Sequence, residues 1–201
     1  MIKKIVAILI LTLSILNAQE SNATKEPKFI LKDIYGKTTT VYGLKNGLKI
    51  PDAKGKVVLI EFWGTHCPPC LMSIPHYIDL TKKYKDKLAI YAIEVQATPK
   101  DRLLEFAKQK GINYNIFTQD ENINFVRYLA QRAGWRGAIP FLVIFDQSGN
   151  VVDMKIGMVS EKYLEQVIDF LNSDKYKNQN KSSSKTKDTN STKADNNSSK
   201  K

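Results

Sequence analysis

The two cysteines of this 201-residue chain stand three positions apart, in Cys67-Pro68-Pro69-Cys70. They follow an apolar run that predicts a buried strand, and the residues after them predict a helix to about Lys83. A cysteine at a helix N-terminus lies beside unpaired backbone N–H groups and the positive end of the helix dipole. Both favour the thiolate, which is the reactive form. The spacing therefore predicts redox chemistry, with Cys67 as nucleophile and Cys70 as resolving thiol.

The composition limits other chemistry for these residues. Two cysteines exclude a disulfide scaffold and a four-thiolate zinc site, and two histidines leave few ligands, so no metal centre is expected. A structural disulfide is one alternative, although so short a loop removes little entropy from the unfolded chain. A Cu(I) site formed by Cys67, Cys70 and His66 is another.

Strand patterns recur on both sides of the cysteines. Apolar runs predict strands at residues 57–62, 88–95, 115–118, 141–145 and 151–156. A turn joins the last two strands into a hairpin, and a further hairpin is predicted within residues 29–42. With helices between the strands, this order indicates an α/β domain of three layers around a central mixed sheet.

Capping signals position three helices after the cysteine helix. Thr98 is the predicted N-cap of the first, with Pro99 at its first turn and Gly111 as its stop. Residues 124–133 predict the second helix. Ser160 caps the last, whose apolar face carries Leu164, Val167, Ile168 and Leu171.

The cysteine segment, Val58-Leu-Ile-Glu-Phe-Trp-Gly-Thr-His-Cys-Pro-Pro-Cys70, resembles the active-site segment of thioredoxin-fold proteins. The match is to the exported TlpA/ResA-like group of thiol–disulfide oxidoreductases. It covers roughly residues 28–171 and includes Pro75 in the first helix and Ile139-Pro140-Phe141 before a strand. The resemblance implies a thioredoxin fold with an N-terminal β extension and an inserted β/α segment before the cis-proline.

The resemblance also implies roles for other residues. Pro140 matches the family's cis-proline, and Ile139 would present its backbone to a substrate peptide. Glu61, the ionisable residue of its apolar strand, matches the family's buried acid and would exchange protons with Cys70. The alternatives are an ordinary trans proline and a solvent-facing glutamate. The other expected contacts of the active site are Trp63, Pro68 and Pro69.

Two positions depart from the family pattern. His66 stands where the family usually has tryptophan, and a protonated imidazole beside Cys67 would stabilise the thiolate and make the protein more oxidising. The alternative is a surface residue that replaces an aromatic contact. Ser73 stands where the group often has glutamate, which argues against assignment to the cytochrome-c-maturation subgroup and leaves Glu61 as the expected proton carrier. His76 is expected to be an exposed helix residue.

Both ends of the chain lie outside the predicted domain, residues 28–172. Residues 1–18 have a basic start, an aliphatic run and a small final residue, the layout of a secretory signal cleaved at Ala18 or Ala23. As a helix the aliphatic run spans about 18 Å, which is too short for a hydrocarbon core of about 30 Å and therefore favours a cleaved signal. An uncleaved N-terminal anchor is the alternative. Residues 19–27 are a short linker, and 173–201 a disordered tail rich in Lys, Ser and Asn.

The net charge of +11 resides mostly in these ends. Eight lysines and three aspartates give residues 173–201 a charge of +5, Lys3 and Lys4 add +2, and +4 remains for the body. No nucleic-acid partner is therefore expected, and the tail would make no more than a weak contact with a membrane surface.

The same ends carry candidate glycosylation sites. Asn22, Asn190 and Asn197 begin Asn-x-Ser/Thr sequences and follow an acidic residue two positions earlier. This pattern resembles the extended acceptor of bacterial oligosaccharyltransferases. A chance occurrence in a tail rich in Asn and Ser is the alternative.

The expected function is that of a periplasmic thiol–disulfide oxidoreductase. It would be a monomer that reduces disulfides of substrate proteins, such as apocytochrome c, with a membrane thiol reductant as donor. No cofactor is expected beyond the redox-active Cys67–Cys70 disulfide. A broad-range oxidase or isomerase on the same fold is the main alternative, and a copper chaperone is a further one.

Overall fold

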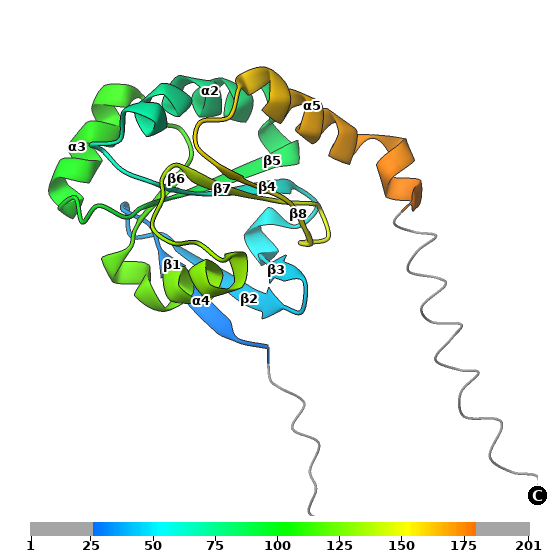
Figure 1. Ribbon diagram of the computed structural model, residues 1–201, viewed down its shortest axis with the longest axis horizontal. Helices are drawn as coiled ribbons and strands as arrows, with labels where there is room; N and C mark the ends of the chain where they lie inside the picture. The colour runs from blue at the N-terminus through cyan, green and yellow to red at the C-terminus, as the bar shows by residue number, and fades with distance from the viewer. Residues whose placement is uncertain (1–25, 180–201) are drawn as a thin grey trace, which may run out of the picture.

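The computed structural model describes residues 26–179. Its central sheet has the strand order β6-β5-β4-β7-β8 (Figure 1). The strands are β4 (Val57–Trp63), β5 (Leu88–Glu94), β6 (Asn115–Thr118), β7 (Phe141–Phe145) and β8 (Val151–Ile156). β5 is parallel to β4 and β6, whereas β7 is antiparallel to β4 and β8. The predicted strands and the mixed sheet are confirmed, with each strand end within one residue of its expected place.

The N-terminal β extension is a separate antiparallel sheet of three strands. It contains β1 (Lys28–Lys32), β2 (Thr38–Leu44) and β3 (Gly47–Lys49). The predicted hairpin thus gains a third strand. β3 meets the turn before β8 at Gly47, where a Cβ would lie 1.9 Å from the Gly149 carbonyl oxygen, so only glycine permits this approach.

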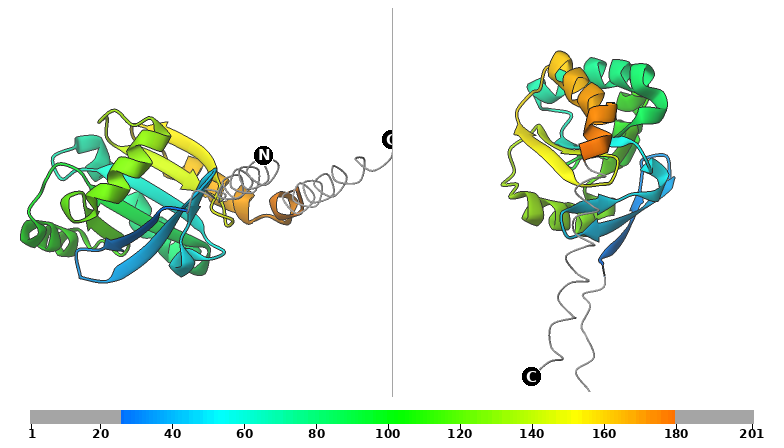
Figure 2. Two further views of the ribbon diagram at one scale, coloured as in Figure 1. Left: turned by 90° about the horizontal axis from the view of Figure 1, so that it is seen from below. Right: turned by 90° about the vertical axis from the view of Figure 1, so that its right-hand side faces the viewer.

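Within residues 26–172, four α-helices complete the layers. They are α2 (Pro68–Tyr84), α3 (Lys100–Lys110), α4 (Ile123–Ala133) and α5 (Glu161–Asn172). The short 3₁₀ helices are η1 (Pro51–Ala53), η2 (Lys85–Lys87) and η3 (Asp120–Asn122). Helices α2, α3 and α5 cover one face of the central sheet, which we call the α2 face (Figures 1 and 2). Helix α4 and the N-terminal sheet cover the other, the α4 face.

The side chains of β4 alternate between these two faces. Leu59 and Trp63 pack on the α2 face, whereas Ile60 and Phe62 pack on the α4 face. All seven residues of β4 are buried, as its continuous apolar pattern predicts. The alternation places Glu61 on the α2 face, under the helix that the cysteines begin.

The expected inserted segment consists of α3 and β6. It follows β5, and β6 extends the sheet by pairing in parallel with that strand. Gly111 ends α3 in the left-handed conformation, as predicted, but the expected N-cap is wrong. Pro99 is the N-cap, because the Thr98 hydroxyl donates to the buried carboxylate of Glu94. Ser160 caps α5 as predicted, by accepting a hydrogen bond from the Tyr163 amide.

Contacts with the fold continue beyond residues 28–172 at both ends. Pro27, assigned to the linker, accepts a hydrogen bond from the Gly43 amide in β2. Residues 174–179, assigned to the tail, are helical. Tyr176 anchors them, because its ring packs edge-on against Phe170 at 5.4 Å and its hydroxyl donates to Asp146. The signal at 1–18, Asn22, Asn190 and Asn197, and the tail from residue 180 lie outside the described residues.

Within residues 26–179 no helix has the length and apolar character needed to cross a bilayer.

Candidate active site

Cys67 is the N-cap residue of α2, as the sequence predicts. Pro68 and Pro69 open the helix, where a fixed φ suits the first turn and a missing N–H is not needed. The Cys70 amide points at Cys67 Sγ over 3.3 Å. The two sulfurs are joined in a disulfide, so this is the oxidised state. Cys67 is 6% exposed and Cys70 1%, so an external thiol or disulfide reaches Cys67 first.

The pairing of β7 with β4 places Pro140 at the end of the sheet near the cysteines. Pro140 immediately precedes β7, which pairs with β4 so that Phe141 lies opposite Phe62, near the end of β4 that leads to Cys67. The Ile139–Pro140 peptide bond is cis. Pro140 is buried and its carbonyl accepts the Gly157 amide, while Ile139 is half-buried and packs against the cluster that holds both cysteines. Ile139 thus packs against the cysteine cluster although it lies 72 positions after Cys67 in the sequence.

Trp63 is the last residue of β4 and precedes Cys67 by four positions. It is 1% exposed and belongs to the same buried cluster as Cys67 and Cys70. Its ring lies 5.9 Å from that of Phe106 in α3. Its indole Nε1 is buried and has no hydrogen-bond partner among the described residues. Trp63 thus contributes to the apolar cluster that contains both cysteines.

Glu61 is buried beneath α2, as expected. Burial raises its pKa from an ordinary 4.5 to about 8, because the charged form loses its hydration. A hydrogen bond of 2.8 Å from the Tyr77 hydroxyl opposes that rise. Burial and the neighbouring Glu61 in turn raise the pKa of Tyr77 well above its usual 10. The site therefore holds a buried carboxyl group whose pKa lies far above that of an exposed glutamate.

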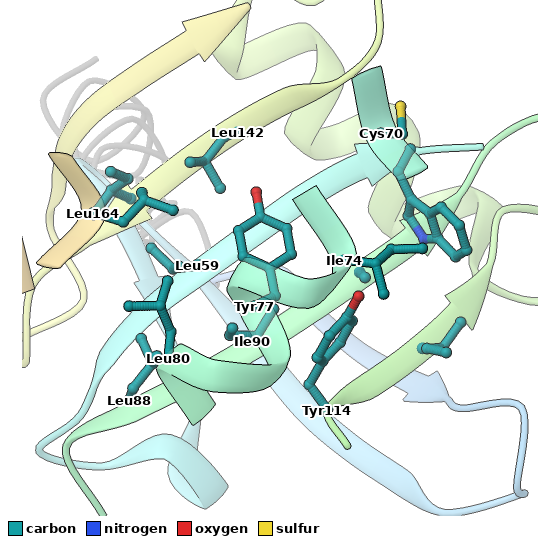
Figure 3. Close-up of a cluster of buried hydrophobic side chains, with 14 of the residues drawn as sticks. Leu59, Cys70, Ile74, Tyr77, Leu80, Leu88, Ile90, Tyr114, Leu142 and Leu164 are labelled. Carbon is teal, nitrogen blue, oxygen red and sulfur yellow. The ribbon is translucent and has the colours of Figure 1, made fainter. Parts of the chain in front are cut away.

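Two tyrosines around Glu61 are missed by sequence reasoning. Tyr77 lies two turns after Cys70 on the same side of α2, and Tyr114 meets its ring edge-on at 5.9 Å. Figure 3 shows Tyr77 inside the buried cluster of the α2 face, with Cys70 towards one end and Leu164 towards the other. The signal in the sequence is the spacing of Tyr77 from Ile74 and Cys70, which places all three on the buried side of one helix.

A Tyr77→Phe variant tests the contact with Glu61. Without the hydroxyl the carboxylate loses a donor, so the pKa of Glu61 is expected to rise further and unfolding to become easier by about 1–3 kcal/mol. The pKa can be followed through the carboxyl ¹³C resonance of Glu61. Tyr114→Phe is the matched control, since the pKa of Tyr114 is raised by burial first and by the charge of Glu61 second. Equal effects of the two variants would refute the assignment.

A second buried acid, Glu94, organises the loop beside the cysteines. It is 1% exposed and ends β5 opposite Trp63. Its Oε1 accepts from the Gln96 amide at 3.1 Å and the Thr98 hydroxyl at 2.8 Å, and its Oε2 accepts from the Thr98 amide at 3.0 Å. The side-chain oxygen of Gln96 accepts the His66 amide at 2.8 Å. The loop 95–99 is thus bonded to the residue before Cys67.

His66, Ser73 and His76 differ in their exposure to solvent. The side chain of His66 is exposed, and its Nδ1 lies 3.1 Å from the Thr65 hydroxyl. Ser73 is buried and donates to the Pro69 carbonyl within α2. His76 is half-buried, with Nδ1 inaccessible, so the expected exposed residue is wrong. The reason is that position 76 lies at the border of the buried side of α2.

In the described part of the chain, no group of three or more His, Cys, Asp or Glu residues is placed to hold a metal ion.

Sequence comparison identifies the protein's relatives. The Redoxin family model matches residues 23–168. The chain belongs to the Redoxin family. The thioredoxin-like protein YneN of Bacillus subtilis is 32% identical to this redoxin over 145 residues, or 71% of this chain and 76% of YneN. Thiol-disulfide oxidoreductase ResA of Halalkalibacterium halodurans is 25% identical over 144 residues, covering 71% and 73%.

Structural comparison shows the thioredoxin fold. A crystal structure of a thioredoxin-family thiol:disulfide interchange protein from Chlorobium tepidum matches with a TM-score of 0.61 at 22% identity. It covers 73% of this redoxin and 94% of that chain. The resemblance to the ResA-like group is confirmed, and this redoxin is a thiol–disulfide oxidoreductase with a Cys67–Cys70 pair.

Proposed function

We propose that this redoxin reduces disulfides of exported substrate proteins in the periplasm, with apocytochrome c as one substrate. The observation that carries the proposal is the place of Cys67. It caps α2 beside the Cys70 amide and is the more exposed member of a buried pair. A substrate peptide would lie along the backbone of Ile139 and Pro140, next to the sulfur it exchanges with.

The reaction uses both cysteines in turn. The Cys67 thiolate of the reduced protein attacks one sulfur of a substrate disulfide, so a new S–S bond forms, the old one breaks and one substrate thiolate leaves. Cys70 then loses its proton and attacks Cys67 Sγ. This releases the second substrate thiolate and forms the Cys67–Cys70 disulfide. Two electrons pass to the substrate, and no cofactor other than the cysteine pair is needed.

Glu61 is the proposed acceptor of the Cys70 proton. It lies on the α2 face two residues before Trp63, which shares a cluster with Cys70. Its raised pKa, about 8, lets it take and return a proton near neutral pH. The other buried acid of this face, Glu94, is occupied by three donors from its own loop.

Turnover requires a partner that returns the two electrons. We propose a membrane dithiol donor, which would reduce the Cys67–Cys70 disulfide by the reverse exchange. The basic start and aliphatic run of residues 1–18 support export by a secretory signal. We also propose a monomer. The distribution of charge supports a protein without a nucleic-acid partner, whose tail contacts anionic lipid no more than weakly.

A disulfide oxidase is the second candidate, and His66 favours it. An imidazolium next to Cys67 stabilises the thiolate and therefore the reduced protein, which makes the disulfide a stronger oxidant.

A Cys70→Ser variant in the native host tests the proposal. Without the resolving thiol, substrates are expected to remain joined to Cys67 as mixed disulfides, visible on non-reducing gels and identified by mass spectrometry. The double variant Cys67→Ser, Cys70→Ser is the control and traps nothing. Absence of adducts, together with no thiol-dependent turnover of a model disulfide by the wild-type protein, would overturn the function.

A further inference from the structure

A chain of hydrogen bonds leads from Glu94 to the imidazole next to Cys67. The Thr98 hydroxyl lies 2.8 Å from Glu94 Oε1, and the Thr65 hydroxyl lies 2.7 Å from that of Thr98. His66 Nδ1 completes the chain, 3.1 Å from the Thr65 hydroxyl. A buried carboxylate is thus linked through two hydroxyl groups to a side chain that adjoins the nucleophile.

The number of available protons fixes the direction of this chain. A hydroxyl group has one proton to donate, and an ionised carboxylate has none. Thr98 therefore donates to Glu94, and Thr65 donates to Thr98. The hydroxyl proton of Thr65 is then used, so the contact with His66 requires a proton on Nδ1. The neutral imidazole accordingly keeps its lone pair on Nε2.

The loop around this chain is held rigidly. Glu94 accepts two backbone amides in addition to the Thr98 hydroxyl, and Gln96 accepts the His66 amide. The side chain of Gln96 also covers Gly64, where a Cβ would lie 2.1 Å from its Oε1. Ala97 has a φ of 59°, a left-handed conformation that alanine seldom adopts and that here sits at the tip of the loop.

We propose that Glu94, Thr98 and Thr65 are positioning residues that hold His66 with a proton on Nδ1. The chain selects one tautomer and one ring orientation of the imidazole. The selection of the tautomer depends on the hydrogen bonds alone. Its effect on the Cys67 thiolate rests on the proposed function.

The tautomer can be measured by ¹⁵N NMR on the oxidised protein, at a pH where both imidazoles are neutral. The chain has two histidines, so His76 provides an internal reference in the same spectrum. In the wild type, His66 is expected to show a protonated Nδ1 and an unprotonated Nε2. Thr98→Val keeps the shape of the side chain but breaks the chain, so His66 is expected to shift towards the Nε2–H tautomer.

Thr81→Val is the matched control. It also removes one hydroxyl from a half-buried threonine, but that hydroxyl donates to the Tyr77 carbonyl within α2. The His66 resonances are expected to stay unchanged. Thr65→Val is a second variant that removes the hydroxyl facing Nδ1, and it is expected to shift the tautomer in the same direction as Thr98→Val. An Nε2–H tautomer in the wild type, or resonances that neither variant moves, would overturn the proposal.

A rate measurement separates this proposal from the function it rests on. In the reduced protein, Thr98→Val is expected to slow the reaction of Cys67 with a model disulfide about three- to tenfold, the size of one hydrogen bond. If the wild type shows the expected tautomer but reduces no disulfide, the proposed function fails and the hydrogen-bond chain stands. If the wild type reduces disulfides but His66 carries its proton on Nε2, the chain fails and the function stands.

Discussion

A Cys67→Ser variant is expected to lose disulfide reduction by about four orders of magnitude. The reaction begins with a thiolate at the N-cap of α2, and a serine hydroxyl at that position does not ionise near neutral pH. Cys70 cannot replace it, because it is 1% exposed and lies one turn inside the helix. The measurement is the reduction of a model protein disulfide, with dithiothreitol as electron donor.

The Cys70→Ser variant is the control for this loss. It is also inactive over many turnovers, but it is expected to form the first mixed disulfide at a rate near that of the wild type. A single-turnover experiment with a labelled disulfide separates the two variants. If Cys67→Ser formed the adduct and Cys70→Ser did not, the roles of the two cysteines would be reversed.

A Glu61→Gln variant is expected to remove most of the pH dependence of stability between pH 4 and 8. The pKa of Glu61 is about 8 in the folded protein and near 4.5 when exposed, so the folded state binds this proton more tightly than the unfolded state. The free energy of unfolding is therefore highest below pH 4.5 and falls as the pH rises to 8. By pH 7 the contribution of this group has fallen by about 3 kcal/mol.

Denaturant unfolding at several pH values measures this effect. Relative to Glu61→Gln, the wild type is expected to lose about 3 kcal/mol between pH 4 and pH 7. Glu105→Gln, at an exposed position of α3, is the control and should follow the wild-type curve. Parallel curves for Glu61→Gln and the wild type would show that the acid does not retain its proton.

Glu61→Gln is also expected to slow the attack of Cys70 on the mixed disulfide at Cys67, on the order of a hundredfold.

The elements that position the cysteines could be predicted because their signals are local. A continuous apolar run marks β4, and the prolines after Cys67 mark the start of α2. Pro140 could be placed only through the resemblance to a family, since nothing in its local sequence says that β7 pairs with β4. Glu61 stood out because it is an acid in an apolar strand.

The contacts that tune the site could not be predicted. The bond between Tyr77 and Glu61 joins a helix to a strand, and its existence depends on how the two pack. The role of Thr98 could not be predicted for the same reason. Its local sequence fits an N-cap, whereas its hydroxyl donates to the carboxylate of Glu94. The place of Tyr176 likewise depends on its contacts with Asp146 and Phe170. The polar composition of residues 173–201 does not predict these contacts.

The reduction potential of the Cys67–Cys70 pair tests the central claim most directly. Equilibration against glutathione and dithiothreitol buffers, read by thiol alkylation and mass, gives its value. A reductant of substrate disulfides predicts a potential close to that of thioredoxin, about −270 mV. A potential near that of a strong periplasmic oxidant, about −120 mV, would contradict the reductant and support the oxidase instead.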